Sequence, residues 1–243
     1  MLGAYELVVA ALSAILTLGA IVVCSWKRLL FRYFLLNLYL LANLSFTLGC
    51  YYVYSFFGYA SFQYFYFYYT GDAIQNIVGY VFIGSLFDRL LRGSIFHKYV
   101  RLTLIFTFLL IVAVSARVLS SNLERFYSQF VFEFQQNMYF IGVLLTFLLW
   151  ISMSYLRVES RRFVLLVSGL GIYFSSHAAT YALQFLTPRL DAIAMKIPPL
   201  AYCLMVSLWL YTFLCVPEGE PAAEKPCRLR TPEAALRVQV EGE

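Results

Sequence analysis

Seven apolar stretches of roughly 20 residues follow one another along this chain and occupy nearly all of it up to Val216. They lie at about residues 5–25, 33–56, 72–91, 98–119, 130–155, 163–186 and 192–216, with boundaries good to about three residues. A helix of about 20 residues matches the roughly 30 Å hydrocarbon core of a bilayer. The sequence therefore predicts an all-α, polytopic membrane protein, a bundle of seven transmembrane helices.

The composition supports this class, because 62% of the residues are hydrophobic and only 13% are charged, against about a quarter charged in soluble domains. We expect residues 1–216 to form the transmembrane domain and residues 217–243 to form a disordered cytoplasmic tail. The tail is rich in Pro, Glu, Ala and Arg, a composition that cannot bury a core. A large extramembrane catalytic or ligand-binding domain is not expected.

Lys and Arg are distributed unevenly between the two sides of the predicted bundle. Ten lie in or beside the first, third and fifth loops, and four lie beside the second, fourth and sixth loops. Because Lys and Arg in short loops stay preferentially in the cytoplasm, we expect the N-terminus outside and the C-terminus in the cytoplasm. The same rule accounts for the net charge of +5, and no nucleic-acid partner is expected.

The predicted loop between the second and third helices is strongly aromatic and lacks Lys and Arg. Its aromatic residues are Tyr59, Phe62, Tyr64, Phe65, Tyr66, Phe67, Tyr68 and Tyr69. Amphipathic aromatic rings favour the headgroup level of a membrane. Two interpretations stay open: an interfacial belt or short re-entrant segment, and an aromatic lid over an outward-facing cavity.

Polar side chains recur at helical spacing in the outer halves of three predicted helices. They are Asp72, Gln75 and Asn76 in the third helix, Glu133, Gln136 and Asn137 in the fifth, and His177, Thr180, Tyr181 and Gln184 in the sixth. Residues three or four apart share a helix face, so each helix carries one polar stripe. Polar groups at membrane depth are costly and commonly functional.

Two interpretations of these stripes remain. If they face one another, they form an outward-opening polar pocket for a small ligand. In that pocket Asp72 and Glu133 are the acids, His177 is the deepest titratable group, and Lys196 and Arg117 lie at the rim. Alternatively, the amides and the imidazole cross-link helices by hydrogen bonds worth about 0.6 kcal/mol each, and Asp72 and Lys196 lie at the water interface.

The sequence offers little for a metal, a cofactor or a catalytic centre. The two histidines, His97 and His177, are predicted on opposite sides of the membrane, and the five cysteines are scattered, so neither metal-ligand spacing nor a redox pair is present. Retinal chemistry needs a Lys in the middle of a helix, whereas Lys196 precedes Pro198 at the start of the seventh. No catalytic residue is predicted.

Small residues in the sixth stretch predict close helix contact. Gly169, Gly171 and Ser175 fit the spacing of small residues at helix interfaces in membranes. Packing is a sufficient explanation for them.

Three segments carry a resemblance to a family. They are residues 64–72 (YFYFYYTGD), 31–34 (FRYF) and 208–213 (LWLYTF) before Pro217. With them, most of the chain up to Glu218 resembles a group of uncharacterised seven-helix membrane proteins of acidobacterial-type soil bacteria. The resemblance implies a bacterial inner (cytoplasmic) membrane and an acidic residue after the aromatic run, here Asp72. It implies no activity.

Three functions follow from these patterns. The first is a receptor-like or sensory module that binds a small molecule in the outer pocket and signals to a separate membrane or cytoplasmic protein. The second is a non-catalytic scaffold or accessory subunit, whose polar stripes are packing contacts. The third is a small proton-coupled transporter or lipid-modifying enzyme that uses Asp72, Glu133 and His177. In each case the lipid bilayer is a partner.

Overall fold

The described part of the chain is entirely helical. The computed structural model describes residues 4–58, 61–92, 96–117, 126–158, 160–186 and 194–217, and these contain seven helices and no strand. The helices are α1 (Ala4–Trp26), α2 (Phe34–Phe57), α3 (Phe62–Leu90), α4 (His97–Ala116), α5 (Phe126–Tyr155), α6 (Arg161–Leu186) and α8 (Ile197–Cys215). The all-α prediction is confirmed, and residues 218–243, predicted as a disordered tail, lie outside the described residues.

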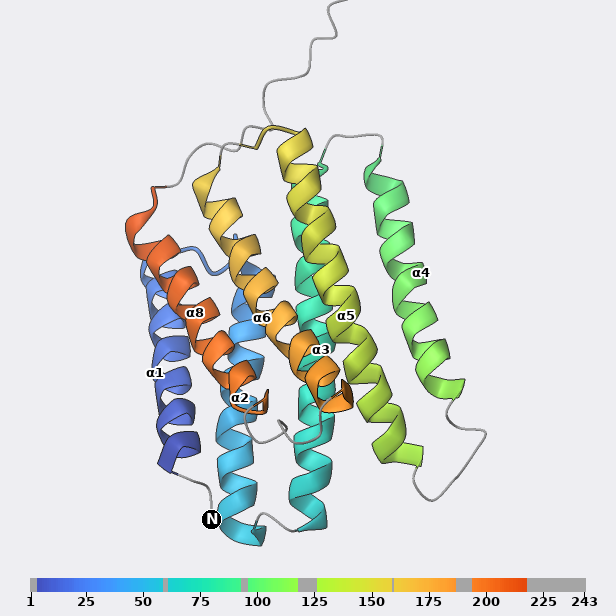
Figure 1. The fold of residues 1–243 in the computed structure, drawn as a ribbon. Helices are drawn as coiled ribbons and strands as arrows, with labels where there is room; N and C mark the ends of the chain where they lie inside the picture. The colour runs from blue at the N-terminus through green and yellow to red at the C-terminus, as the bar shows by residue number, and fades with distance from the viewer. Residues whose placement is uncertain are drawn as a thin grey trace, which may run out of the picture.

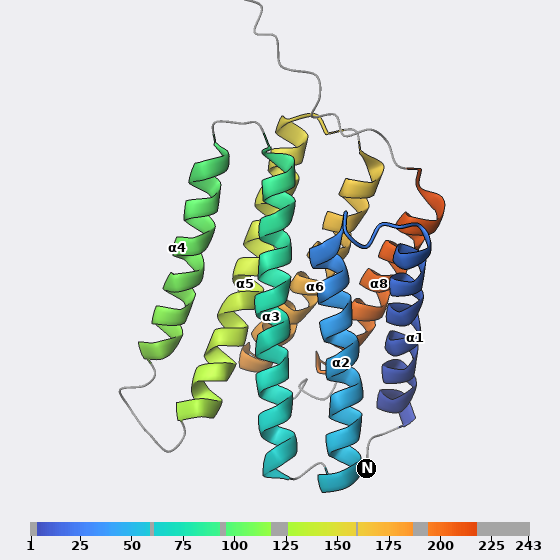
Figure 2. The ribbon, with the colours of Figure 1, turned by 180° about the vertical axis from the view of Figure 1, so that it is seen from behind.

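The helices form two layers and run alternately up and down. Figure 1 shows α5, α6 and α8 in front, and Figure 2, from behind, shows α1, α2, α3 and α4. Six of them, α1, α2, α3, α5, α6 and α8, close a ring in which each packs against its two neighbours. The remaining helix, α4, lies at the edge of the bundle and packs against α5 and α3.

Six of the helices are long and apolar enough to cross a membrane. The exception is α3, whose mean hydropathy is lowered by the amide side chains on its inner face. Gln75 and Asn76 are only 4% and 2% exposed, whereas Ile74, Ile77 and Val81 on the same helix point outward. Gln75 and Asn76 therefore face the bundle interior, and the opposite face of α3 at this level is apolar. The six apolar helices fit a multi-pass membrane protein.

The aromatic segment is helical, so the prediction of a loop there is wrong for its described residues, whereas the interfacial belt and the lid both stay predictions. The helix α3 begins at Phe62, ten residues earlier than predicted, and the Ser61 hydroxyl accepts a hydrogen bond from the Tyr64 backbone N–H at 3.1 Å. Aromatic residues four apart then contact one another along the helix, such as Phe62 and Tyr66, whose ring centroids are 4.3 Å apart. Such pairs and a Ser cap favour a helix; Tyr59 lies outside the described residues.

The aromatic turns of α3 pack against α2 through two reciprocal contacts between a glycine and a phenylalanine. Phe67 of α3 lies against Gly49 of α2, and Phe46 of α2 lies against Gly71 of α3. A Cβ added at Gly49 of α2 would lie 2.4 Å from the Phe67 ring, and one at Gly71 of α3 would lie 2.3 Å from the Phe46 ring. The two rings also stack on each other, with 6.1 Å between centroids. Small residues let helices approach closely in membranes, so this reciprocal packing holds the aromatic segment against α2.

Trp209 of α8 fills the middle of the bundle and is fully buried. Its indole N–H donates a hydrogen bond to the Leu166 carbonyl of α6 at 3.1 Å, and its ring meets Tyr39 and Phe82 edge-on at 6.0 and 5.7 Å. The indole lies over Gly169, where an added Cβ would come within 2.6 Å of Nε1. Close contact on α6 is thus made at Gly169.

The close contact predicted for Gly171 is not formed. No described atom outside its own surroundings lies within 4 Å of a Cβ built there. The reason is angular: two residues along a helix turn the side chain by about 200°, so Gly169 and Gly171 face opposite ways. Only one of the two can face α8.

The end of the bundle where α1, α3, α5 and α8 finish is held by basic side chains. Lys27 Nζ donates to the carbonyls of Phe213 and Leu214 at 2.6 and 3.1 Å, and Arg162 Nε donates to Val216 at 2.8 Å. These cations satisfy carbonyls that the end of a helix leaves without an intrahelical partner. At the same end Asp88 pairs with His97, linking α3 to α4.

Candidate functional site

A carboxyl group lies between α3 and α5 in the bundle. Asp72 is half-buried, and the Tyr139 hydroxyl of α5 donates a hydrogen bond to its Oδ1 at 3.3 Å. The carboxyl also interacts electrostatically with the hydroxyls of Tyr68 and Tyr181. Within the described ranges it forms no ion pair with a Lys, Arg or His. Asp72 is thus an acid next to tyrosine hydroxyls, with no cationic side chain paired to it among the described residues.

The imidazole of His177 lies against the same tyrosine. Its ring stacks on Tyr139 with 4.3 Å between centroids and 19° between planes, and it meets Tyr173 at 4.3 Å. Its Nδ1 lies 3.0 Å from the Tyr173 carbonyl oxygen, which can only accept, so Nδ1 is the donor. In the neutral ring Nε2 therefore keeps its lone pair as an acceptor.

Two amides of α3 lie one turn deeper than Asp72. The Gln75 Oε1 accepts a hydrogen bond from Asn43 Nδ2 of α2 at 3.4 Å, and Asn76 lies beside the Tyr139 hydroxyl. Neither Gln75 Nε2 nor Asn76 Nδ2 has a direct hydrogen bond to a described residue. A buried donor left without a partner costs about 1–3 kcal/mol, so these two amides favour an occupant that offers acceptors.

These contacts define the core polar cluster, which consists of Asp72, Gln75, Asn76, Tyr139, Tyr173 and His177. A side arm reaches from it along α5 toward the start of α3. The Tyr181 hydroxyl donates to Gln135 Oε1, and Gln135 Nε2 donates to the Tyr69 carbonyl, both at 3.3 Å. Helices α3, α5 and α6 are thereby joined on one level of the bundle.

Of the predicted site residues, the structure brings those of α3 and part of those of α6 together. Asp72, Gln75, Asn76 and His177 belong to the core polar cluster, and Tyr181 belongs to its side arm. Gln184 lies half-buried near the end of α6. The polar stripes of α3 and α6 thus do face each other across the bundle.

The predicted stripe of α5 does not join this cluster. Asn137 Nδ2 donates to Ser115 Oγ of α4 at 3.3 Å, which turns the stripe toward α4. Glu133 lies four residues earlier on that face, and both it and Gln136 are half-buried with no hydrogen bond to a described residue. The face that α5 presents to the cluster carries Gln135 and Tyr139 instead.

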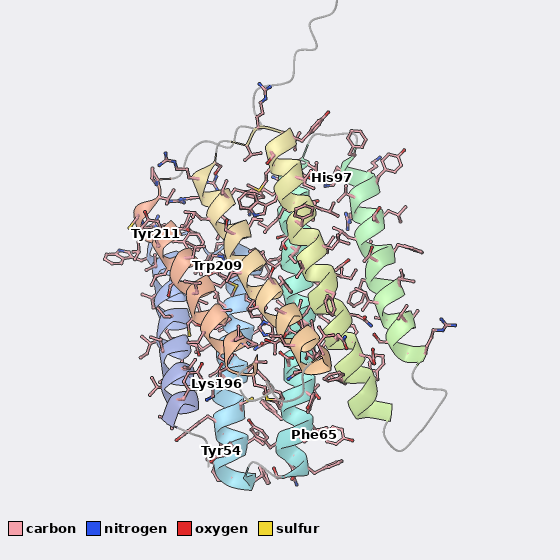
Figure 3. The ribbon with its side chains drawn as sticks, viewed as in Figure 1. Tyr54, Phe65, His97, Lys196, Trp209 and Tyr211 are labelled. Atoms are coloured by element: carbon pink, nitrogen blue, oxygen red, sulfur yellow. The ribbon has the colours of Figure 1, made fainter. Side chains whose placement is uncertain are left out.

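The two cations predicted for the rim lie apart from the cluster. Lys196 is exposed at the start of α8, where its Nζ lies 5.5 Å from the centre of the Tyr5 ring and its carbonyl accepts from the Tyr5 hydroxyl at 2.8 Å. Arg117 is exposed at the end of α4. Figure 3 shows His97 near one end of the bundle and Lys196 toward the other, short of Tyr54 and Phe65, with Trp209 between the levels of His97 and Lys196.

The sequence missed five residues that build the site: Tyr39, Asn43, Gln135, Tyr139 and Tyr173. Four of them form two pairs with helical spacing, because Gln135 and Tyr139 are four residues apart, as are Tyr39 and Asn43. In a chain with 20 tyrosines, however, nothing in the spacing separates a buried hydroxyl from one at the membrane surface.

The site is made of hydrogen-bonding groups and aromatic rings. Within the described ranges no three His, Cys, Asp or Glu side chains come together in a way that could hold a metal ion. What the cluster offers is a carboxylate, an imidazole acceptor, amide donors and aromatic surfaces.

Comparison with known proteins adds no relative. No protein family, curated protein or solved structure matches the chain.

Proposed function

We propose that the chain is a receptor-like or sensory seven-helix module that binds a small polar molecule at the core polar cluster and signals to a separate protein. The observation that carries the proposal is Asp72, a carboxyl inside the bundle that forms no ion pair with a described residue. Next to it lie two buried amide donors, Gln75 Nε2 and Asn76 Nδ2, that form no direct hydrogen bond with a described residue. Such groups inside a membrane protein are expensive and are kept where they serve a function.

The proposal counts α3 as the seventh membrane span. At 29 residues it is about 43 Å long, which exceeds the hydrocarbon core. It packs between α2 and α5 in the ring, and its amides Gln75 and Asn76 face inward. A membrane-spanning helix in such surroundings can have a lower mean hydropathy than a helix exposed to lipid on all sides, because its inner face contacts protein.

Orientation follows from the basic end of the bundle. Ten described cations lie in or beside the connections α1–α2, α3–α4 and α5–α6: Lys27, Arg28, Arg32, Arg89, Arg92, Lys98, Arg101, Arg157, Arg161 and Arg162. The positive-inside rule then favours a cytoplasmic location for this end, with the N-terminus outside. With this orientation the core polar cluster would lie in the outer half of the membrane. The same orientation is compatible with a bacterial inner membrane.

Reporter fusions test the seven-span topology in bacteria. A fluorescent protein that folds only in the cytoplasm should fluoresce when fused after Pro217, and alkaline phosphatase, active only outside, should be active when inserted between α2 and α3. Equal activity of both reporters at both positions, or the reverse pattern, would contradict the orientation. Fluorescence at both positions would show that the number of crossings between them is even.

Ligand binding is tested by native mass spectrometry of the protein released from lipid nanodiscs. We expect the wild type to retain a small molecule and Asp72→Asn to lose at least about tenfold in occupancy, equivalent to about 1.4 kcal/mol of binding free energy. The control is Asp88→Asn, the same change at the other end of α3, where Asp88 contacts His97. It should retain the molecule.

Two results would contradict the proposal. Equal occupancy in the wild type and Asp72→Asn would place the molecule elsewhere. A stoichiometric protein partner without any small molecule would favour the accessory-subunit hypothesis instead.

A further inference from the structure

We infer that the ligand is a small organic ammonium compound that carries an oxygen acceptor about one helical turn, or roughly 5 Å, from its nitrogen. The inference rests on the proposed function and assigns the chemical class of its ligand. It follows from the order of groups along the inner face of α3, which runs from Asp72 to Gln75 and Asn76.

The first group to be matched is the Asp72 carboxylate. Its direct hydrogen bond within the described residues comes from the neutral Tyr139 hydroxyl, and no described cation pairs with it. A carboxylate away from water is stabilised most by an opposite charge held at hydrogen-bonding distance. An ammonium group supplies both the charge and the donors.

The groups around Asp72 are neutral hydroxyls. The Tyr139 hydroxyl donates to its Oδ1, and Tyr68 and Tyr181 interact electrostatically with the carboxyl. The Tyr139 ring itself stacks on His177. Neutral hydroxyls leave the negative charge of a carboxylate uncompensated, so this carboxylate is better matched to an ammonium than to an anion or a neutral hydrocarbon.

The second group to be matched is the pair of amides one turn deeper. Gln75 Oε1 accepts a hydrogen bond from Asn43. Neither the Nε2 donor of Gln75 nor the Nδ2 donor of Asn76 has a direct hydrogen bond to a described residue. The Tyr39 hydroxyl, beside Tyr173, also lacks a direct hydrogen bond to a described residue. A carbonyl or carboxylate oxygen is the acceptor that satisfies such donors.

The depth of the site is limited by large aromatic side chains. A Cβ at Gly79, one turn below Gln75, would meet Tyr39 at 3.4 Å, and Tyr39 in turn packs against Phe82 and Trp209. These rings close the inner face of α3 below the amides. The ligand therefore spans Asp72 to the amides and extends no deeper.

Three probes of matched size test this class on the full chain in nanodiscs, with empty nanodiscs as the blank. They are 4-aminobutanamide, which carries both groups; pentanamide, in which a methyl replaces the ammonium; and pentylammonium, which lacks the acceptor. Dissociation constants come from ligand-observed NMR titration. We expect 4-aminobutanamide to bind at least about tenfold more tightly than pentanamide and at least about threefold more tightly than pentylammonium.

Variants assign each preference to its side chain. Asp72→Asn should abolish the preference for 4-aminobutanamide over pentanamide, whereas Asp88→Asn should keep it. Asn76→Leu should abolish the preference over pentylammonium and leave the affinity for pentylammonium itself unchanged. If Asp72→Asn fails to fold, Tyr139→Phe, which removes the hydroxyl that donates to Asp72 and keeps the ring, should still weaken 4-aminobutanamide more than pentanamide.

The outcomes separate the inference from the proposed function. Equal binding of pentanamide and 4-aminobutanamide, or preferences that survive Asp72→Asn, would overturn the inference. If mass spectrometry then finds a neutral or anionic molecule whose retention depends on Asp72, the proposed function stands with a different ligand class. If no probe binds and no small molecule is retained, both are overturned and the amides are satisfied by water alone.

Discussion

Trp209→Ala is expected to lower the free energy of unfolding by about 3–5 kcal/mol, the cost of removing a large buried aromatic side chain. The indole is fully buried where α2, α3, α6 and α8 meet, and its N–H bonds the Leu166 carbonyl. Its neighbours are themselves rings and glycine, so they cannot collapse far into the space. The change would also remove the aromatic floor below the core polar cluster.

The measurement is unfolding in mixed detergent, followed by helical circular dichroism as the fraction of denaturing detergent is raised. The matched control is Trp26→Ala, because Trp26 is 86% exposed at the end of α1 and its loss should cost less than about 1 kcal/mol. Equal destabilisation by the two changes would show that Trp209 is not the central packing residue.

Gly142→Ala is expected to lower the free energy of unfolding by about 1–3 kcal/mol, the usual cost of inserting a methyl group into a filled core. Its new Cβ would lie 2.3 Å from Cδ1 of Phe174 on α6. The Phe174 ring must then move, and it packs against Tyr139 with 6.2 Å between centroids. The same displacement should weaken ligand binding through Tyr139.

Gly171→Ala is the matched control for this change, again measured by unfolding in mixed detergent. It lies in a neighbouring helix, and no described atom outside its own surroundings is within 4 Å of the new Cβ. Since Ala favours a helix over Gly by up to about 1 kcal/mol, this variant should be as stable as the wild type or more stable. Destabilisation by Gly171→Ala equal to that by Gly142→Ala would contradict the packing described here.

The helical class and the approximate places of the helices could be predicted from the sequence, because long apolar stretches have one common solution in a bilayer. The start of α3 could not. Residues 62–71 are aromatic and polar in composition, and what makes them helical is the Ser61 cap together with packing of Phe67 and Phe46 against glycines of the opposite helix. Those contacts depend on which helices are neighbours.

The residues that α3 and α6 bring to the candidate site could be predicted from the sequence, but those of α5 could not. Helical spacing alone predicted that Asp72, Asn76 and His177 would lie near one another, because they lie on the inward faces of α3 and α6. On α5 two polar faces exist, and the face with Glu133 and Asn137 turns to α4 while Gln135 and Tyr139 turn inward. A helix with polar residues on both sides does not reveal its orientation until its neighbours are known.

A cryo-electron microscopy map of the protein in nanodiscs, at a resolution that separates water from organic ligands, tests most directly whether the core polar cluster holds a small molecule. We expect non-protein density larger than a water molecule in contact with the Asp72 carboxyl and the Asn76 amide, and we expect this density to be absent in Asp72→Asn. Isolated water density at Gln75 and Asn76 with Asp72 bonded only to protein groups would contradict this expectation.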